Sequence, residues 1–114
     1  MILVAKDSIP GLQKGKEYFC FGINIFIDMG LVFALIRRDI DGTPILEDIK
    51  HFDLKDVNNF SEWVVEKKYN GLRIFLTPKE FVDFDWDLYN DGDENMDNEF
   101  ERKYSFLLKN IHLN

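Results

Sequence analysis

The 114-residue chain has a single cysteine, Cys20, so it cannot form an intrachain disulfide and is not a disulfide-framed scaffold of the secreted kind. It also lacks any apolar stretch near the roughly 20 residues that span a bilayer. The apolar opening, residues 1–5, ends at Lys6-Asp7, which is too short for a signal peptide. We therefore expect a cytoplasmic protein, in which Cys20 lies in an apolar run as a buried, unreactive thiol.

Residues that carry catalysis are scarce as well. The two histidines, His51 and His112, have no nucleophile at a recognisable spacing, and a Cys20–His51 pair would need an accessible thiol and a third, orienting group. Residues 11–16 superficially resemble a phosphate-binding loop but lack its length and the Ser or Thr after the lysine. We expect a protein that is not an enzyme, needs no cofactor and works by binding a partner.

Basic residues are absent from one long segment of the chain. The net charge is −7, which argues against binding to nucleic acid or to an anionic membrane. The rest of the chain carries 12 acidic and 14 basic residues, so all of the excess negative charge is local. The segment without Lys or Arg contains nine acids: Asp83, Asp85, Asp87, Asp91, Asp93, Glu94, Asp97, Glu99 and Glu101.

The acidic segment does not fit a metal-binding motif. When residues 87–98 are aligned with a calcium loop, Gly92 falls at the required sixth place. However, Tyr89 then stands where an oxygen ligand belongs, and Asn98 replaces the terminal glutamate. No Cys/His pattern for zinc is present either, so we expect no metal site.

Strand signals fill the first three-quarters of the chain. We expect strands at residues 1–5, at 17–27, where alternation predicts one buried face with a bend at Gly22, and at 31–36. Asp41-Gly42 predicts a turn, after which Pro44 indicates an edge strand, and residues 51–59 read as irregular. Asn70-Gly71 between residues 63–69 and 72–76 is a strong hairpin signal, because both central residues of a type I′ turn need positive φ.

The period then changes to that of helices. Thr77 as N-cap, Pro78 at the first helical position and Glu80 three residues after Thr77 predict a helix that continues to residue 90. A second helix follows, with one apolar face composed of Met96, Phe100, Tyr104, Leu107, Leu108 and Ile111.

These elements predict an α+β fold, with five or six strands in a small curled antiparallel sheet or an SH3-like barrel, followed by two C-terminal helices. We expect a single domain over residues 1–114, strand-rich over 1–76 and helical over 77–112.

The candidate binding surface is the acidic helical segment. Asp83 and Asp87 would lie one helical turn apart, with Asp91 continuing their stripe past the helix end. A surface of this charge attracts a cationic partner, and aromatic residues ringed by charge are common interface anchors. The candidate residues are Asp83, Trp86, Asp87, Tyr89, Asp91, Glu94 and Asp97.

A structural explanation of the same residues stays open at this point. Acidic residues in the first turn of a helix stabilise it by about 0.3–1 kcal/mol each, and like-charge pairs one turn apart cost only about 0.2–0.5 kcal/mol. Trp86 and Tyr89 can equally be core residues. Helix stabilisation and core packing do not by themselves require that nineteen consecutive positions lack a basic residue.

The chain resembles small, acidic, aromatic-rich bacterial immunity proteins of polymorphic toxin systems, including contact-dependent growth inhibition. The resemblance is one of overall style over the full length. It rests on the opening residues 11–18 (GLQKGKEY), the short strands, and residues 84–93 (FDWDLYNDGD) before the last helix. It implies binding to a cognate protein toxin, commonly a basic nuclease, at or near its active site, and it brings no catalytic residues.

Two functions of different classes are therefore under consideration. One is an immunity protein that neutralises a cationic nuclease. The other is a non-catalytic structural or scaffolding subunit that docks through an apolar sheet face. The sequence leaves the toxin, the oligomeric state and the strand order undetermined.

Overall fold

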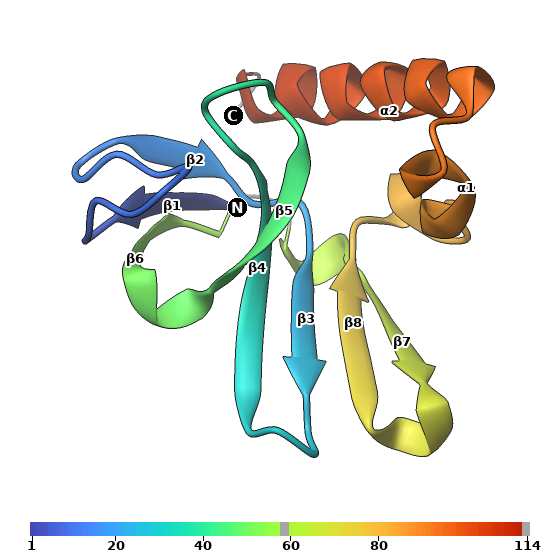
Figure 1. The fold of residues 1–114 in the computed structure, drawn as a ribbon, viewed down its shortest axis with the longest axis horizontal. Helices are drawn as coiled ribbons and strands as arrows, with labels where there is room; N and C mark the ends of the chain where they lie inside the picture. The colour runs from blue at the N-terminus through green and yellow to red at the C-terminus, as the bar shows by residue number, and fades with distance from the viewer. Residues whose placement is uncertain (58–59, 113–114) are drawn as a thin grey trace. The chain divides into compact units, whose positions relative to one another are not determined.

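The computed structural model describes residues 1–57 and 60–112. The chain divides into two compact units, Met1–Pro78 and Lys79–Asn114, and each is described by itself. The first unit contains all the described strands and the second contains both α-helices (Figure 1). This is the α+β class that the sequence predicts.

Eight short strands form two antiparallel sheets in the first unit. The three-stranded sheet has the order β2-β1-β6, the five-stranded sheet has the order β5-β4-β3-β8-β7, and neither closes into a barrel. The SH3-like alternative is therefore not formed, and the predicted single sheet is two sheets. The strands are β1 (Ile2–Ala5), β2 (Glu17–Phe19), β3 (Ile23–Phe26), β4 (Leu31–Arg37), β5 (Pro44–Asp48), β6 (Phe52–Asp56), β7 (Val64–Lys68) and β8 (Arg73–Thr77).

The long strand predicted at residues 17–27 is divided between the two sheets. Cys20 still donates its N–H to Met1 in the first sheet, at 2.8 Å, whereas Gly22 accepts a 2.8 Å bond from Leu35 in the second. A Cβ atom at Gly22 would lie 3.2 Å from the Leu35 side chain, so glycine permits this close approach. The expected bend at Gly22 is thus the point where the chain passes from one sheet to the other.

The main core lies in this first unit, and both Cys20 and Ala34 within it are fully buried. One face of the five-stranded sheet contributes to it through β3 and β4. The buried members are Leu3, Ala5, Leu12, Tyr18, Cys20, Ile23, Ala34, Ile36 and Phe52.

Residues 52–56 form a strand, so the prediction of an irregular segment over 51–59 is wrong there. β6 pairs with β1 in an antiparallel register in which Ala5 faces Phe52. Phe52 is buried, while the next four residues, Leu54 among them, are exposed, so only one side chain of this strand contributes to the core. The pairing with β1 supplies the backbone hydrogen bonds that decide the conformation. Residues 58–59 lie outside the described part of the chain.

The predicted turns are confirmed. Leu72 donates its N–H to the Tyr69 carbonyl at 3.1 Å, and the central residues Asn70 and Gly71 both have positive φ, 56° and 85°. The loop between the paired ends of β7 and β8, Lys68 and Arg73, is nevertheless four residues long.

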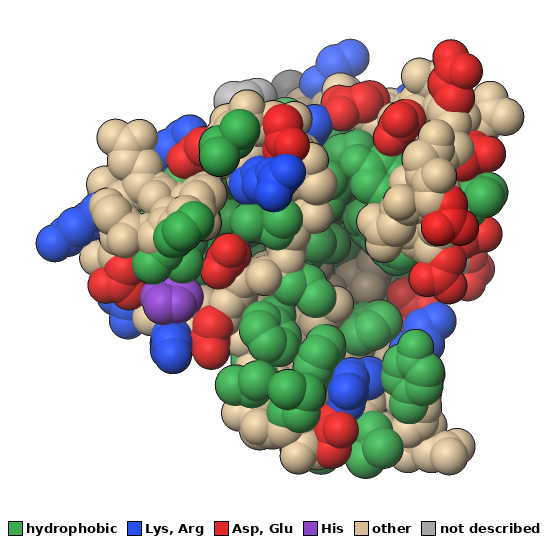
Figure 2. All heavy atoms as spheres, viewed as in Figure 1, with side chains coloured by type: hydrophobic (Ala, Val, Ile, Leu, Met, Phe, Trp, Pro, Cys, Tyr) green, Lys and Arg blue, Asp and Glu red, His purple; other side chains and the backbone are tan. Residues whose placement is uncertain are grey.

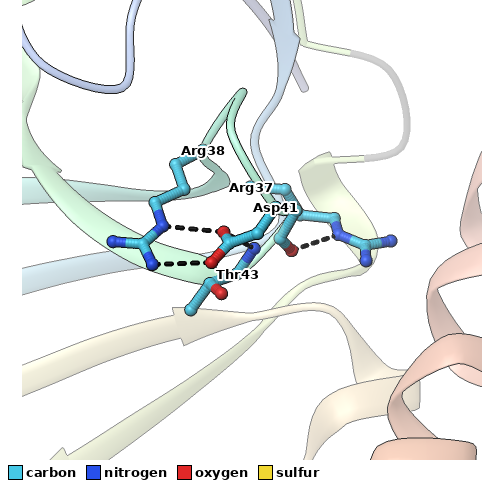
Figure 3. Close-up of polar contacts among 5 residues, drawn as sticks. Arg37, Arg38, Asp41 and Thr43 are labelled. Carbon is cyan, nitrogen blue, oxygen red and sulfur yellow. Dashed lines mark hydrogen bonds and ion pairs between the residues drawn. The ribbon is translucent and has the colours of Figure 1, made fainter.

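At the second turn, Asp41 accepts a bidentate pair of bonds from Arg38 at 2.7 Å each and a third from the Thr43 N–H (Figure 3). Arg37 donates to the Gly42 carbonyl, with its guanidinium on the other side of the turn. β5 follows at the edge of its sheet, as Pro44 predicts.

The helix predicted over residues 77–90 is not formed as one continuous element. Thr77 ends β8 opposite Val64 instead of capping a helix. A single 3₁₀ turn at Lys79–Phe81 follows, and Asp83 at φ 64° interrupts the helical path. Helix α1 is therefore only Trp86–Asn90.

The last helix is confirmed as α2, Glu94–His112. Phe100 is fully buried on the predicted apolar face, and Met96, Tyr104, Leu107 and Leu108 are half-buried. The side chain of Ile111 lies outside the described residues.

Candidate functional site

Both α-helices begin within the acidic segment, and two of the segment's carboxylates act as N-caps. Asp85 precedes α1 and accepts a 2.9 Å hydrogen bond from the Leu88 N–H. Asp93 precedes α2 and accepts one from the Met96 N–H, also at 2.9 Å. Each bond satisfies a backbone donor that the helix itself leaves unpaired. These two aspartates therefore have a structural role.

Three more acids lie in the first turns of these helices. Asp87 is in α1, and Glu94 and Asp97 are in α2. A negative charge at this end of a helix is stabilising because it faces the positive end of the helix dipole. All three side chains are nevertheless exposed.

Asp83 and Asp91 have no such helix-stabilising role. Asp83 is exposed at positive φ, a conformation that aspartate tolerates better than most residues, and it does not lie on a helix with Asp87. Asp91 is exposed at the C-cap of α1, the end of a helix at which a negative charge is unfavourable. The stripe predicted from Asp83 through Asp87 to Asp91 is therefore not a helical stripe.

None of the five candidate carboxylates is in an ion pair within residues 1–57 and 60–112. The first basic residues after the segment are engaged by groups other than these five: Arg102 pairs with Glu99 at 2.6 Å, and Lys103 donates to the Glu80 carbonyl at 2.6 Å. The negative field of the segment is thus uncompensated at these positions. The five are Asp83, Asp87, Asp91, Glu94 and Asp97.

The two candidate anchors pack into an aromatic cluster of the second unit. Trp86 stacks on Phe81 with ring centroids 5.8 Å apart, and Tyr89 lies 5.3 Å from the buried Phe100. Phe84 contacts both of them, at 4.7 Å and 5.9 Å. Trp86 and Tyr89 are half-buried, so most of each side chain stabilises the unit and the remainder faces solvent.

The negative charge of the chain is concentrated in residues 79–114. The unit has ten acidic and four basic residues and a net charge of −6, whereas residues 1–78 have 11 acidic and ten basic residues. Aromatic side chains of α1 and α2 pack together, and the candidate acids of this unit are exposed. A surface of this kind can attract a cation-rich protein and repel acidic ones.

Sequence reasoning missed a contact between Asp7 and His51. Asp7 Oδ2 lies 3.0 Å from His51 Nδ1, and the hydrogen bond with His51 lowers the pKa of the Asp7 carboxyl. The two residues are 44 positions apart, and no local signal predicts their meeting.

The Cys20–His51 pair considered from the sequence would need an accessible thiol, and Cys20 does not provide one. Cys20 is fully buried and donates its thiol to the Gly22 carbonyl at 3.1 Å. Burial raises the pKa of this thiol to about 11, so its nucleophilic thiolate form is disfavoured. The side chain of His112 lies outside the described residues.

Neither a metal cluster nor a membrane-spanning helix is present in the described part of the chain. No group of three or more His, Cys, Asp or Glu side chains there could hold a metal ion, so residues 87–97 do not converge as a calcium loop would. No described helix is both long and apolar enough to cross a membrane. Comparison with family models, curated proteins and solved structures finds no match for this chain.

Proposed function

We propose that this chain is an immunity protein, which binds and neutralises a cytotoxic protein, a cationic nuclease domain, through the acidic surface of residues 83–97. One observation carries the proposal: five exposed carboxylates lie beside an aromatic cluster, and none of them has an ion-pair partner in the described part of the chain. Helix stability gives no reason for acids at Asp83 and Asp91, and a basic partner does.

The chemistry of a nuclease suits this surface. Its active site binds the phosphates of nucleic acid with Lys and Arg side chains. Carboxylates of the inhibitor would take the places of those phosphates, and their field would accelerate association by steering. The exposed parts of Trp86 and Tyr89 would add apolar contact beside the charges.

Affinity capture with the intact chain, eluted along a salt gradient, tests this proposal. We expect one basic protein that salt releases and that is toxic when expressed without this chain. A captured protein that resists salt and is harmless alone would contradict it.

A matched pair of variants then locates the contact. Asp83→Asn/Asp91→Asn removes two charges from the acidic surface, and Asn tolerates the positive φ at position 83. Asp53→Asn/Glu62→Gln removes two charges from exposed positions of the first unit. We expect roughly tenfold slower association at low salt for the first variant and no change for the second. Equal rates would place the interface elsewhere.

A scaffolding subunit is the second candidate, favoured by the outer face of the five-stranded sheet. Phe26 and Phe33 lie there with ring centroids 5.0 Å apart, and Phe33 and Phe75 both face Asn24 in the sheet register. These three rings are half-buried and lie outside the main core. An interface built on them would respond little to salt, which separates this candidate from the first.

A further inference from the structure

The tip of the hairpin between β7 and β8 presents an asparagine directly before a glycine. Asn70 and Gly71 are the central residues of the four-residue loop between the paired Lys68 and Arg73. This loop closes the hairpin at its lower end in Figure 1, and that end lies at the surface in Figure 2. The Asn70 side chain is exposed and makes no hydrogen bond within the described part of the chain. No other asparagine in the sequence precedes a glycine.

An asparagine side chain can lose ammonia without an enzyme. The backbone nitrogen of the next residue attacks the side-chain Cγ and gives up its proton. The new N–Cγ bond closes a five-membered succinimide ring, and the Cγ–Nδ2 bond breaks as ammonia leaves. Water then opens the ring at either carbonyl, which yields aspartate or an isoaspartate whose backbone runs through Cβ. Nothing is oxidised or reduced, and water is the only co-reactant.

Gly71 is the least hindered type of residue for this attack, because it has no Cβ atom beside the reacting nitrogen. A Cβ atom added to Gly71 would meet nothing within 4 Å, so the space on that side of its backbone is open. Neighbouring side chains therefore do not shield the nitrogen there, and the backbone conformation of the turn decides whether the ring can close.

The folded turn holds the reacting atoms apart. Asn70 has a φ of 56° and a ψ of 33°, and this ψ places the Gly71 nitrogen and the Asn70 Cβ on nearly opposite sides of the Cα–C bond. Ring closure needs both atoms on the same side, so the turn must open first. Tyr69 and Asn70 both have positive φ, which costs conformational energy in residues other than glycine and so favours opening. Exposed loops are also among the segments that open at low free energy.

Two aspartates also precede a glycine, Asp41 and Asp91, but they lack the reactive amide of Asn70. Ring closure at an aspartate must expel a carboxyl oxygen as water, and an aspartate carboxylate, which is ionised near neutral pH, resists attack by a nucleophile. Asp41 is restrained further by two 2.7 Å bonds from Arg38 and a 3.0 Å bond from the Thr43 N–H. Of the three pairs, the one at Asn70 is therefore the most reactive near neutral pH.

We infer that Asn70 is a site of spontaneous deamidation, at which the side-chain amide is hydrolysed to a carboxylate with release of ammonia. The aspartyl product keeps the turn, because aspartate tolerates positive φ better than most residues. The isoaspartyl product adds a backbone atom to the loop and so disturbs the 3.1 Å bond from the Leu72 N–H to the Tyr69 carbonyl. The site lies outside residues 83–97, so this inference does not depend on the proposed function.

Incubation of the purified, intact chain at mildly alkaline pH, followed by trypsin digestion and mass spectrometry, tests the inference. Trypsin cleaves after Lys68 and Arg73 and releases residues 69–73, in which Asn70 has the only side-chain amide. We expect this peptide to gain a carboxyl group at a rate at least about tenfold above that of any other asparagine. It should separate into two forms, of which an isoaspartate-specific methyltransferase identifies the isoaspartyl one.

Two glycine variants distinguish the chemistry of this pair from general effects of substitution. Gly71→Asn places a side chain beside the attacking nitrogen, and Asn tolerates the positive φ at this position better than most residues. Gly15→Asn makes the same change at another glycine with positive φ, where an added Cβ also meets nothing within 4 Å. We expect Gly71→Asn to slow the conversion of Asn70 at least about fivefold and Gly15→Asn to leave it unchanged. Equal rates in Gly71→Asn and the parent would overturn the inference.

The unaltered chain decides the question should Gly71→Asn fail to fold. In concentrated urea the conversion of Asn70 should be faster than in the folded chain, because no turn has to open. A slower rate in urea would contradict the opening step. A folded chain in which residues 69–73 keep their amide while other asparagines convert would exclude the site. All of these measurements use the chain alone, so their failure leaves the proposed toxin binding untouched.

Discussion

The hydroxyl of Tyr18 donates a 2.7 Å hydrogen bond to Oδ2 of Asp39, which links β2 to the end of β4 across 21 positions of sequence. The Tyr18 hydroxyl oxygen in turn accepts a 2.7 Å bond from the Gln13 N–H, and Lys16 pairs with the other carboxylate oxygen of Asp39. Burial raises the pKa of Tyr18, and the bond to Asp39 acts in the same direction. This small network fastens the loop before β2 to the five-stranded sheet.

Tyr18→Phe should therefore destabilise the chain by about 1–3 kcal/mol, because it removes a bond to a charged acceptor and leaves the Gln13 N–H without its partner. Urea unfolding measures the change. Tyr69→Phe removes the hydroxyl of an exposed tyrosine and should remain within about 0.5 kcal/mol of the parent. Equal midpoints for Tyr18→Phe and the parent would show that the network contributes nothing.

Stability should fall in acid. Hydrogen bonds from Lys16 and then Tyr18 lower the pKa of Asp39, and the bond from Arg38 is the main cause that lowers the pKa of Asp41. A carboxyl with a lowered folded pKa adds stability that is present above its unfolded value and is lost as pH falls towards the folded value. We expect a constant free energy of unfolding above about pH 5 and a steady loss below about pH 4.

Asp39→Asn tests the contribution of one group to this acid sensitivity. Because it removes a carboxylate whose ionised form the fold stabilises, the drop in unfolding free energy between neutral and acid pH should be smaller in the variant. Urea titrations across the acid range measure both slopes. An unaltered slope would mean that Asp39 has the same pKa in the folded and unfolded chains.

Cys20 should be unreactive in the folded chain. It is fully buried, and burial raises its pKa to about 11. Maleimide labelling should be at least about 100-fold slower than in concentrated urea, because it requires opening of the core. Ser61→Cys, in a chain that also carries Cys20→Ser, places a thiol at an exposed position as the control. Comparable native rates at the two positions would contradict the burial of Cys20.

The sequence predicts features that depend on neighbouring residues. Asn70-Gly71 and Asp41-Gly42 form turns because positive φ is a local requirement, and α2 follows its own apolar period. The signals at Thr77 and at residues 17–27 fail for one reason: pairing with residues distant in sequence overrides local propensity. Thr77 belongs to β8 because Val64 faces it across the hairpin.

The candidate site divides in the same way. The sequence predicts that Asp83 and Asp91 are exposed, because no basic residue lies near them in the chain that could form a buried ion pair with them. The environment of Trp86 follows from Phe81 and Phe100, and no spacing within residues 83–97 reveals it.

The last prediction separates structural acids from those available to a partner. Asp85→Ala should destabilise the chain by about 1 kcal/mol, because the Leu88 N–H loses its acceptor, while Asp85→Asn should retain stability because Asn caps as well as Asp. Asp91→Asn should also be neutral, since its carboxylate makes no hydrogen bond within the described residues.

Thermal unfolding of the three variants gives the comparison. If Asp85→Asn loses as much stability as Asp85→Ala, the charge rather than the hydrogen bond stabilises α1. If the expected pattern holds, structure accounts for Asp85 and not for Asp91. Stability then leaves the Asp91 carboxylate unexplained, as the proposed contact with a cationic partner requires.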